Sequence, residues 1–366
     1  MKRILFFADA QSIHTQRWVH ECAARGFDCV VATRRPGEVP GAREVIPVRP
    51  GGDGAGWLLA IPEVRRIARR VAPQWVHGHY VTSYGLWAAA SGLGPGVPVV
   101  LTAWGSDLLV TPHEPGWHGA AMAALVGWSL RRAQLVTADS QDMLAEVRRY
   151  GVSARCEEVL WGADTERFRP GTPAAGFEVA SLRAWEPNYN IDTLLRAWAR
   201  LRAERPDATA TLHLLGGGPD AAALQALAAE LGLGDSVRFT GRVDDAAMVA
   251  TLQRCRVSVS VPSSDATSVS LLESMACGLP VVASDLPANR QWVEPASGLL
   301  VPPRDADALA VALQGLLDEP ERALALGRRN RELALQRASR RLQMDRMAVL
   351  YDALRLRAPA PLELVR

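Results

Sequence analysis

Two carboxylates eight positions apart, Asp265 and Glu273, stand out in the segment SSDATSVSLLESMACGLPVVAS, residues 263–284. The apolar spacing after Thr267 and Ser268 predicts a helix that begins between the two acids, with these hydroxyl residues as candidate N-caps. The unpaired backbone N–H groups of that helix would then lie between two acidic side chains. Such an arrangement could bind a phosphate, because a helix N-terminus carries free donors and a partial positive charge.

Thr267, Ser268 and Val269 supply the amides expected at this anion site. A purely structural interpretation competes with it, because Asp or Ser before a helix is commonly only a cap. The stretch SLLE, residues 270–273, also fits a capping box, in which the glutamate closes the helix N-terminus. The rest of the sequence is needed to choose between a phosphate site and a structural helix cap.

Two further loops that follow predicted strands could contact a ligand. Arg183 lies in the loop 181–190, and a guanidinium at a strand end is a suitable clamp for phosphate because its charge is fixed and its donors form a planar fork. By itself, Arg183 is equally compatible with a surface position. Gly217 and Gly218 belong to the turn LGGGP, residues 215–219, which fits an ordinary strand-to-helix turn that also lines a cleft.

Histidines occur in two places where catalysis is conceivable. His14 lies in the loop ADAQSIHT after the first predicted strand, and His77 and His79 flank a glycine at the end of a later one. His14, His77 and His79 could reach a substrate hydroxyl or a sugar, and each could equally be a structural histidine. The remaining histidines have no such context: His20, His113, His118 and His213.

Short apolar runs that alternate with helical patterns would position these loops. The expected strands are residues 3–7, 28–33, 75–77, 97–102, 135–138, 177–181, 210–215, 237–240, 257–261 and 281–283. This βαβ rhythm predicts parallel, doubly wound sheets, in which ligands bind at the carboxyl ends of the strands. Almost all residues from 306 to 357 favour helix.

The length of 366 residues exceeds what one hydrophobic core usually fills, so we expect two Rossmann-like α/β domains facing a cleft. The segment GADTERFRPGTPAAG, residues 162–176, is rich in Pro, Gly and charge and is typical of a linker. We therefore place the domains at 1–170 and 171–345, followed by a helical segment, 346–366, that returns to the first domain.

Composition excludes several classes of protein. No apolar run is long enough for a membrane span, and no cleavable signal peptide is evident, so we expect a cytoplasmic protein. The net charge of +2 argues against a nucleic-acid partner. A basic run, Arg65–Arg70, fits a solvated helix face, and contact with anionic lipid at the inner face of the membrane is the functional alternative.

The sequence also argues against a bound metal. Its five cysteines are widely spaced without a Cys-x-x-Cys pair. No group of histidine and acidic residues has the sequence spacing that is typical of metal ligands. The Asp305-Ala-Asp307 triplet matches an Asp-x-Asp metal-binding pattern, but its position before a predicted helix favours a cap. We therefore expect no metal and no cofactor.

The second half of the chain resembles the donor domain of family 4 retaining glycosyltransferases, also described as group 1, which have the GT-B fold and an E-x7-E signature. The resemblance is carried by the Arg183 loop, the GGGP turn, VRFTGRVDDAAMVATLQRCRVSVSVPSS and DATSVSLLESMACGLPVVASDLPANRQWV. The segments SIHTQRWVHECAARGFDCVVAT, HGHYVTSYG and LTAWGSDLL are similar to the acceptor domain of a bacterial branch of that family.

The resemblance implies a role for each motif residue. Glu273 would accept hydrogen bonds from the ribose of a nucleoside diphosphate sugar, and Asp265 would approach the transferred sugar. Arg183 and the helix amides would hold the diphosphate. The implied reaction is metal-independent, retaining transfer by front-face displacement, in which the departing diphosphate helps to deprotonate a hydroxyl of a saccharide, lipid-linked or small-molecule acceptor.

Three positions depart from the family pattern. The first acid is Asp265 rather than glutamate, and Tyr189 and Asn190 lie near the place of a phosphate-binding lysine. No lysine can replace it, because the only one in the chain is Lys2. Trp104 stands where many relatives carry a histidine. Arg183 and the helix amides must then neutralise the diphosphate, or a second arginine must contribute.

Two other functions are compatible with this fold. A nucleotide-sugar epimerase or hydrolase would need a general acid or base, for which His14 and His79 are the candidates, and it would work without an acceptor. A non-catalytic binder of sugar nucleotides is the second alternative, because the missing lysine weakens the case for leaving-group stabilisation.

Overall fold

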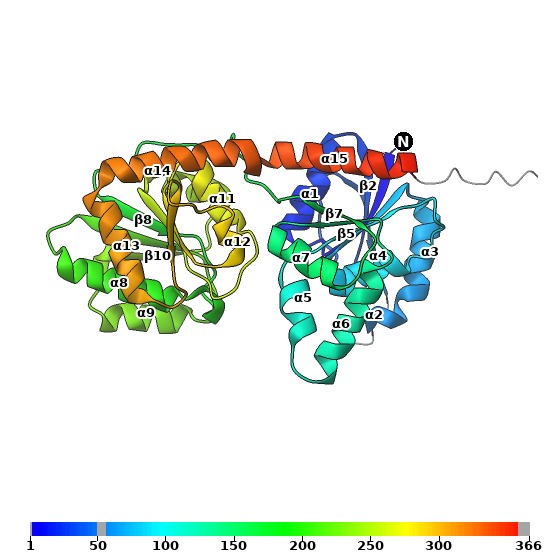
Figure 1. Ribbon diagram of the computed structural model, residues 1–366, viewed down its shortest axis with the longest axis horizontal. Helices are drawn as coiled ribbons and strands as arrows, with labels where there is room; N and C mark the ends of the chain where they lie inside the picture. Colours follow the sequence, from blue (N-terminus) through cyan, green and yellow to red (C-terminus); the bar gives the residue numbers. More distant parts are fainter. Residues whose placement is uncertain (1, 50–55, 358–366) are drawn as a thin grey trace, which may run out of the picture. The chain divides into compact units, whose positions relative to one another are not determined.

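A computed structural model describes residues 2–49 and 56–357 of the chain, which divide into two compact units (Figure 1). The first unit combines the chain up to Trp161 with the segment that begins at Arg341, and the second unit is Gly162–Arg340. The division lies ahead of residue 170 because the expected linker packs onto the second unit. Phe168 is buried there, and Arg331 donates hydrogen bonds to the carbonyls of Thr165 and Phe168.

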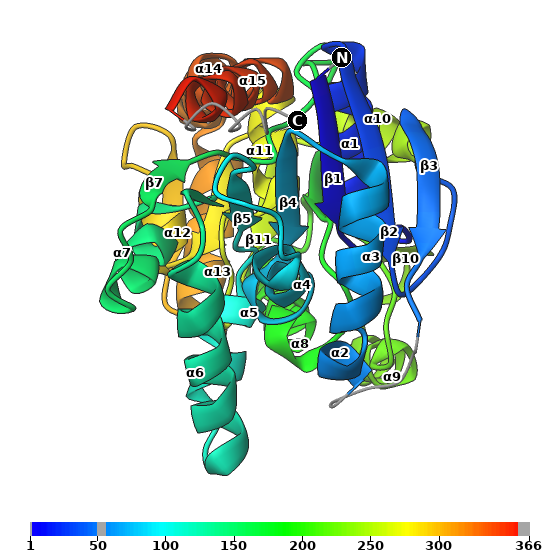
Figure 2. The same cartoon turned by 90° about the vertical axis from the view of Figure 1, so that its right-hand side faces the viewer.

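The first unit contains a parallel sheet of seven strands in the order β3-β2-β1-β4-β5-β6-β7 (Figure 2). The strands are β1 (Lys2–Phe7), β2 (Phe27–Thr33), β3 (Ala42–Pro47), β4 (Trp75–His79), β5 (Val99–Thr102), β6 (Leu135–Ala138) and β7 (Arg155–Glu158). The central strands are largely buried, as expected for strands that helices cover on both faces.

The helices of this unit are α1 (Ile13–Ala24), α2 (Gly56–Leu59), α3 (Ile61–Val71), α4 (Gly85–Ala90), α5 (Ser106–Leu109), α6 (Trp117–Leu130), α7 (Gln141–Arg149) and α15 (Arg340–Arg357). Helices α1 and α15 share one hydrophobic core with strand β1, and α15 contributes Met344, Met347 and Tyr351 to it. The C-terminal helix therefore packs on the first sheet. Residues 358–366 of the expected returning segment lie outside the described residues.

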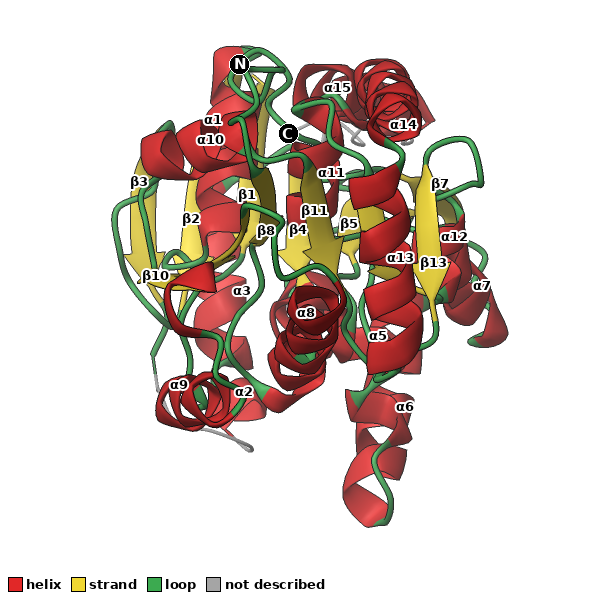
Figure 3. Ribbon diagram, turned by 90° about the vertical axis from the view of Figure 1, so that its left-hand side faces the viewer, coloured by secondary structure: helices red, strands yellow, loops and turns green. Residues whose placement is uncertain are grey.

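The second unit contains a parallel sheet of six strands in the order β10-β9-β8-β11-β12-β13 (Figure 3). The strands are β8 (Phe177–Ser181), β9 (Ala210–Leu215), β10 (Val237–Gly241), β11 (Val257–Ser260), β12 (Val281–Ser284) and β13 (Gly298–Val301). The helices are α8 (Ile191–Glu204), α9 (Ala221–Glu230), α10 (Asp245–Arg254), α11 (Val269–Ala276), α12 (Pro287–Arg290), α13 (Ala306–Asp318) and α14 (Pro320–Leu333). Helices α8, α9 and α13 bury one face of the sheet in a common core.

The two units follow the same doubly wound order, in which the fourth strand along the chain lies beside the first and the winding then reverses direction. The reversal lies between β1 and β4 in the first unit and between β8 and β11 in the second. Ligands of open α/β sheets bind at the carboxyl ends of such strands. Each unit therefore has one expected ligand site, and the predicted fold class of two Rossmann-like domains is confirmed.

Two other expectations concern the surface. Within residues 2–49 and 56–357, none of the helices combines the length and the apolar composition that a membrane crossing requires. The basic run Arg65–Arg70 lies on helix α3, where Arg66 pairs with Glu63 and Arg70 with Glu44. Two of its arginines thus form surface ion pairs, which contribute little stability.

A buried hydrogen-bond chain attaches α15 to the first sheet. His77 on β4 contacts the Tyr351 hydroxyl through Nδ1 at 2.6 Å and the Thr102 hydroxyl through Nε2 at 2.7 Å. Burial lowers the pKa of His77 well below its usual value, so the ring is neutral and can donate from only one nitrogen. The Tyr351 carbonyl also accepts a hydrogen bond from Trp75 Nε1 at 2.8 Å.

We expect Tyr351→Phe to lower the free energy of unfolding by about 1–3 kcal/mol, because it leaves a buried ring nitrogen of His77 without a partner. Urea-induced unfolding followed by circular dichroism measures this change. Asp352→Asn, which removes an exposed ion pair with Lys2, is the control and should cost about 0–1 kcal/mol. Equal effects of the two substitutions would contradict the buried hydrogen bond.

Candidate functional site

The second unit brings Arg183 and Asp265 together at the point where its sheet reverses direction. Arg183 lies two residues beyond the end of β8, and Asp265 follows the neighbouring strand β11. The guanidinium Nη2 of Arg183 donates to a carboxylate oxygen of Asp265 at 2.7 Å. The side chain of Arg183 is only 10% exposed. The alternative of a freely solvated surface arginine is therefore excluded.

Three further contacts hold the Arg183 side chain. Its Nη1 atom donates to the hydroxyls of Ser268 and Ser270, and its guanidinium lies 4.3 Å from the centre of the Tyr189 ring. Ser268 belongs to the N-terminus of helix α11, so the guanidinium and the first amides of α11 lie in one place. Both groups are positive, which makes this edge of the sheet suited to an anion.

Helix α11 begins as the sequence predicts, but its cap differs from the capping-box interpretation. Ser268 is the N-cap and accepts a hydrogen bond from the Leu271 amide. Thr267 instead accepts a hydrogen bond from the Gln291 side chain at 2.7 Å. Glu273 lies beyond the first turn of α11, five residues after the cap, and is 3% exposed. A capping glutamate occupies the third helical position, so Glu273 is not one.

Two opposing effects act on the pKa of the Asp265 carboxylate. Burial raises the pKa of Asp265 above its usual value, while the adjacent Arg183 guanidinium acts in the opposite direction. The ion pair keeps the two side chains in a fixed geometry. A ligand anion at this site must therefore share Arg183 with Asp265.

The glycine turn after β9 packs against the Arg183 loop. A side chain at Gly216 would lie 2.2 Å from the Arg183 carbonyl oxygen, and one at Gly218 would lie 2.2 Å from the Trp185 carbonyl oxygen. A side chain at Gly217 would meet only the flexible Arg242 side chain, at an ordinary contact distance of 3.4 Å. The neighbouring backbone therefore excludes a side chain at Gly216 and Gly218 but not at Gly217.

The place expected for a lysine is occupied by a different network. Tyr189 stacks on Arg183, and Asn190 has a left-handed backbone with φ of 50°. The Asn190 side-chain amide donates to the Val261 carbonyl at 2.9 Å, which ties the loop after β8 to the loop after β11. Arg304 donates to the Asn190 side chain at 3.3 Å and is the second left-handed residue here. These contacts position the Arg183 loop, and they bring a second arginine, Arg304, into the network that joins the two loops.

The corresponding edge of the first unit is aromatic. His14, in the first turn of α1, is half-buried and lies 4.6 Å from the Trp161 ring and 5.4 Å from the Trp104 ring. His79, at the end of β4, is completely buried, and burial lowers its pKa to about 3. A direct role for His79 in catalysis requires the surrounding rings of Trp104 and Trp161 to move. The roles of His14 and His79 stay predictions.

Asp107 supports the same edge of the first unit. Its carboxylate is buried and accepts hydrogen bonds from the amides of Val81 at 2.7 Å and Trp104 at 2.9 Å. Burial raises the pKa of Asp107 to about 6, against these hydrogen bonds. The carboxylate holds the loops after β4 and β5 together and supports Tyr80, which has a φ of 67° and stacks on Trp104.

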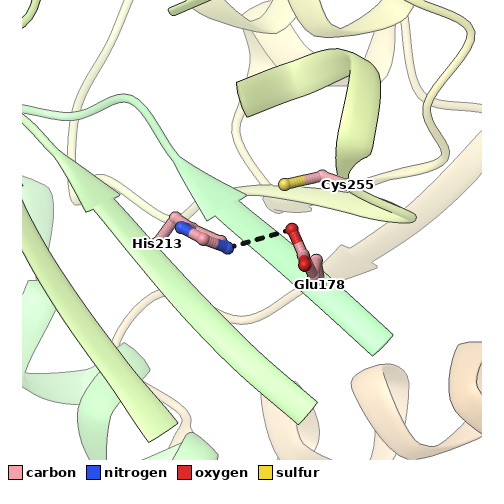
Figure 4. Close-up of side chains that lie close together, drawn as sticks. All are labelled: Glu178, His213 and Cys255. Carbon is pink, nitrogen blue, oxygen red and sulfur yellow. Dashed lines mark ion pairs between the residues drawn. The ribbon is translucent and has the colours of Figure 1, made fainter. Parts of the chain in front are cut away.

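Two groups of residues carry atoms that could bind a metal, and the structure gives them different roles. Asp305 caps α13 by accepting a hydrogen bond from the Ala308 amide at 2.9 Å, so the cap interpretation is confirmed. In contrast, Glu178, His213 and Cys255 converge on one point, although they are far apart in the sequence (Figure 4). Sequence spacing could not reveal this group, because each residue comes from a different segment.

Gly218→Ala and Gly217→Ala form a matched pair. We expect Gly218→Ala to lower the free energy of unfolding by about 1–3 kcal/mol, because its methyl group would overlap the Trp185 carbonyl. Gly217→Ala should leave stability within about 0.5 kcal/mol of the original. Chemical denaturation measures both, and a larger loss for Gly217→Ala would contradict the described turn.

Two protein families match the chain in adjacent regions. Residues 3–140 match the family Glycosyl transferase 4-like, and residues 163–333 match Glycosyl transferases group 1. The two matches coincide with the two α/β units. Both Arg183 and the Asp265 to Glu273 segment lie inside the second match.

Relatives of known activity cover about two thirds of the chain. A GDP-mannose-dependent alpha-(1-6)-phosphatidylinositol monomannoside mannosyltransferase from Mycolicibacterium smegmatis is 30% identical over 271 residues, which is 66% of this chain and 69% of the relative. D-inositol 3-phosphate glycosyltransferase 2 from Catenulispora acidiphila is 32% identical over 269 residues, 65% of this chain and 62% of the relative.

Solved structures share the fold over nearly the full length. Sucrose-phosphate synthase from Thermosynechococcus elongatus has a TM-score of 0.81 at 21% identity and covers 97% of this chain and 99% of its own. The Anabaena protein HepE in complex with UDP has a TM-score of 0.80 at 17% identity, with 96% and 100% covered. With its two parallel sheets and both family matches, the chain belongs to the GT-B glycosyltransferases, with a Glycosyl transferase 4-like N-terminal domain and a group 1 C-terminal domain.

Proposed function

We propose that this glycosyltransferase moves a sugar from a nucleoside diphosphate sugar to an acceptor hydroxyl, with retention of configuration and without a catalytic metal. The observation that carries the proposal is the buried Arg183 guanidinium, which Asp265 and Ser268 hold at the N-terminus of α11. This is a site for a dianionic leaving group at the ligand-binding edge of the sheet.

The donor would lie along the segment from Asp265 to Glu273. Its diphosphate would accept hydrogen bonds from Arg183 and from the amides of Thr267, Ser268 and Val269. Glu273, which has no capping role, would accept hydrogen bonds from the ribose hydroxyls. Asp265 would contact a hydroxyl of the transferred sugar while it keeps its ion pair with Arg183.

The transfer would proceed on one face of the sugar. The bond between the anomeric carbon and the diphosphate oxygen breaks, and the acceptor oxygen bonds to the same carbon from the same side. The acceptor proton passes to the departing diphosphate. Arg183 and the amides near Ser268 stabilise the negative charge that develops on that oxygen, which is commonly the largest single contribution to catalysis.

The relatives suggest which substrates to test first. The Mycolicibacterium smegmatis protein is GDP-mannose-dependent and acts on a phosphatidylinositol monomannoside, and the Catenulispora acidiphila protein is a D-inositol 3-phosphate glycosyltransferase. The Anabaena structure contains UDP. We therefore propose GDP-mannose as the first donor, UDP sugars as the comparison, and inositol-containing acceptors, free or lipid-linked.

We assign acceptor binding to the first unit, at the edge formed by His14, Tyr80 and Trp104. Aromatic faces there suit the apolar face of a sugar or inositol ring. The epimerase or hydrolase alternative is disfavoured, because His79 has a pKa of about 3 and is buried, which does not suit acid–base catalysis near neutral pH. We propose a cytoplasmic location, with the α3 arginines as the membrane-facing side if the acceptor is a lipid.

Donor binding can be measured by thermal shift with GDP, UDP, ADP, dTDP and their sugar conjugates, first without and then with magnesium. We expect one nucleotide to raise the melting temperature without metal, because a ligand that binds only the folded state stabilises it. Glu273→Gln should abolish most of the shift, whereas Glu230→Gln on helix α9 should preserve it. A shift that needs magnesium would overturn the metal-free proposal, and no shift with any nucleotide would overturn nucleotide-sugar binding.

Arg183→Ala should separate turnover from donor binding. If Arg183 stabilises the leaving group, we expect kcat to fall by about a hundredfold or more. The donor dissociation constant should change much less, because the helix amides still bind the diphosphate. Transfer to an inositol acceptor, followed by mass spectrometry, measures kcat, with exposed Arg196→Ala on α8 as the control. An unchanged kcat in Arg183→Ala would exclude this role.

A further inference from the structure

Three side chains with different donor atoms meet inside the second unit (Figure 4). Glu178 lies on β8, His213 on the adjacent strand β9, and Cys255 directly after helix α10. The carboxylate oxygen, the imidazole nitrogen and the thiol sulfur all lie within 4.8 Å of one another. The register pairs Ala180 with His213, so Glu178 and His213 are diagonal neighbours on the same face of the sheet.

The ligand atoms lie at separations that one ion could bridge. Nε2 of His213 and Oε2 of Glu178 form an ion pair at 3.2 Å, and neither atom has a hydrogen-bond partner elsewhere among the described residues. The His213 side chain is 9% exposed, and Cys255 is completely buried. A tetrahedral zinc ion with bonds of about 2.0–2.3 Å separates its ligand atoms by about 3.3–3.8 Å. The His213–Glu178 separation is close to that value, and the Cys255 sulfur lies within 4.8 Å of both atoms.

We propose that Glu178, His213 and Cys255 form a zinc-binding site in the second unit. A thiolate, an imidazole and a carboxylate are the three ligand types that zinc takes in proteins, and sulfur disfavours magnesium and calcium. The fourth position of a tetrahedral ion would hold water. This site is separate from the proposed donor site and does not depend on the proposed function.

The charges around the cluster leave the required atoms available. Arg254 donates to Oε1 of Glu178 at 2.8 Å, so Oε2 remains free for an ion. Burial, with the positive charge of Arg238 and Arg254, lowers the pKa of His213, although the Glu178 carboxylate acts in the opposite direction. Burial raises the pKa of the Cys255 thiol, so binding of one zinc ion must displace one proton from its sulfur. The bound ion, thiolate and carboxylate would then be neutral together.

The position of the cluster indicates a structural role. Glu178 lies three residues before the end of β8, whereas Arg183 lies two residues beyond it. The cluster is therefore set back from the edge where the donor is proposed to bind. An ion there would link β8, β9 and the end of α10, whose main chain already meets β8 through the Arg256 amide and the Glu178 carbonyl at 2.7 Å.

The test uses the full-length protein, freed of metal by a chelator and titrated with Zn²⁺ or Co²⁺. We expect one equivalent of either metal to bind, and bound Co²⁺ to show a thiolate charge-transfer band and the intense visible absorption of tetrahedral cobalt. In Cys255→Ser the affinity should fall at least about tenfold and the thiolate band should disappear. Cys277→Ser, which alters another buried cysteine of this unit, is the control and should bind as the original does.

A second variant and a second measurement guard against a folding defect. His213→Gln should weaken binding in the same way, and circular dichroism confirms that each variant is folded. Glu178 is not the first choice, because its loss would leave Arg254 without its ion pair. Zinc should also raise the melting temperature of the original protein but not that of Cys255→Ser. Failure to bind a stoichiometric metal, or equal binding by Cys255→Ser, would show that the cluster is only an ion-pair network and would overturn the proposal.

Discussion

The contact between Arg183 and Asp265 is the interaction on which the candidate donor site depends. It exists because β8 and β11 are neighbours in the sheet, although 82 residues separate the two side chains. The loop after each strand delivers one partner, and the N-terminus of α11 adds its serines to the same guanidinium. An arginine held in this way has its donors oriented before a ligand arrives, so little side-chain entropy remains to be lost on binding.

The same topology gives the two units corresponding sheet edges that carry different residues. Both sheets reverse direction beside their first strand, so both present loops at the same point. In the second unit those loops carry an arginine, helix amides and acids. In the first unit they carry His14, Tyr80 and Trp104, with Asp107 as a buried brace. One edge is therefore suited to phosphate and the other to the face of a ring.

Much of this could be predicted from the sequence, because buried parallel strands are short apolar runs with clear boundaries. Strands β8 and β9 and the start of α11 lie where the pattern places them. The edge strands β3, β7 and β13 escaped prediction. Strands β3 and β7 are partly exposed and carry charged residues, as AREVIP and RCEE show, whereas β13 is a four-residue strand, GLLV. Pairings between distant segments, such as Arg183 with Asp265, are set by strand order and leave no local signal.

The missing lysine is the feature that most distinguishes the site, and its neighbours suggest how the fold accommodates the loss. Tyr189 replaces a cation with an aromatic face that supports the Arg183 guanidinium and contributes no charge. Asp265 further offsets the charge of Arg183. The α11 N-terminus then adds positive potential from backbone amides that the helix holds in fixed positions. Stabilisation of the leaving group would thus depend on backbone geometry. Ser268 links the helix amides to the Arg183 guanidinium, because it caps α11 and also accepts a hydrogen bond from Arg183.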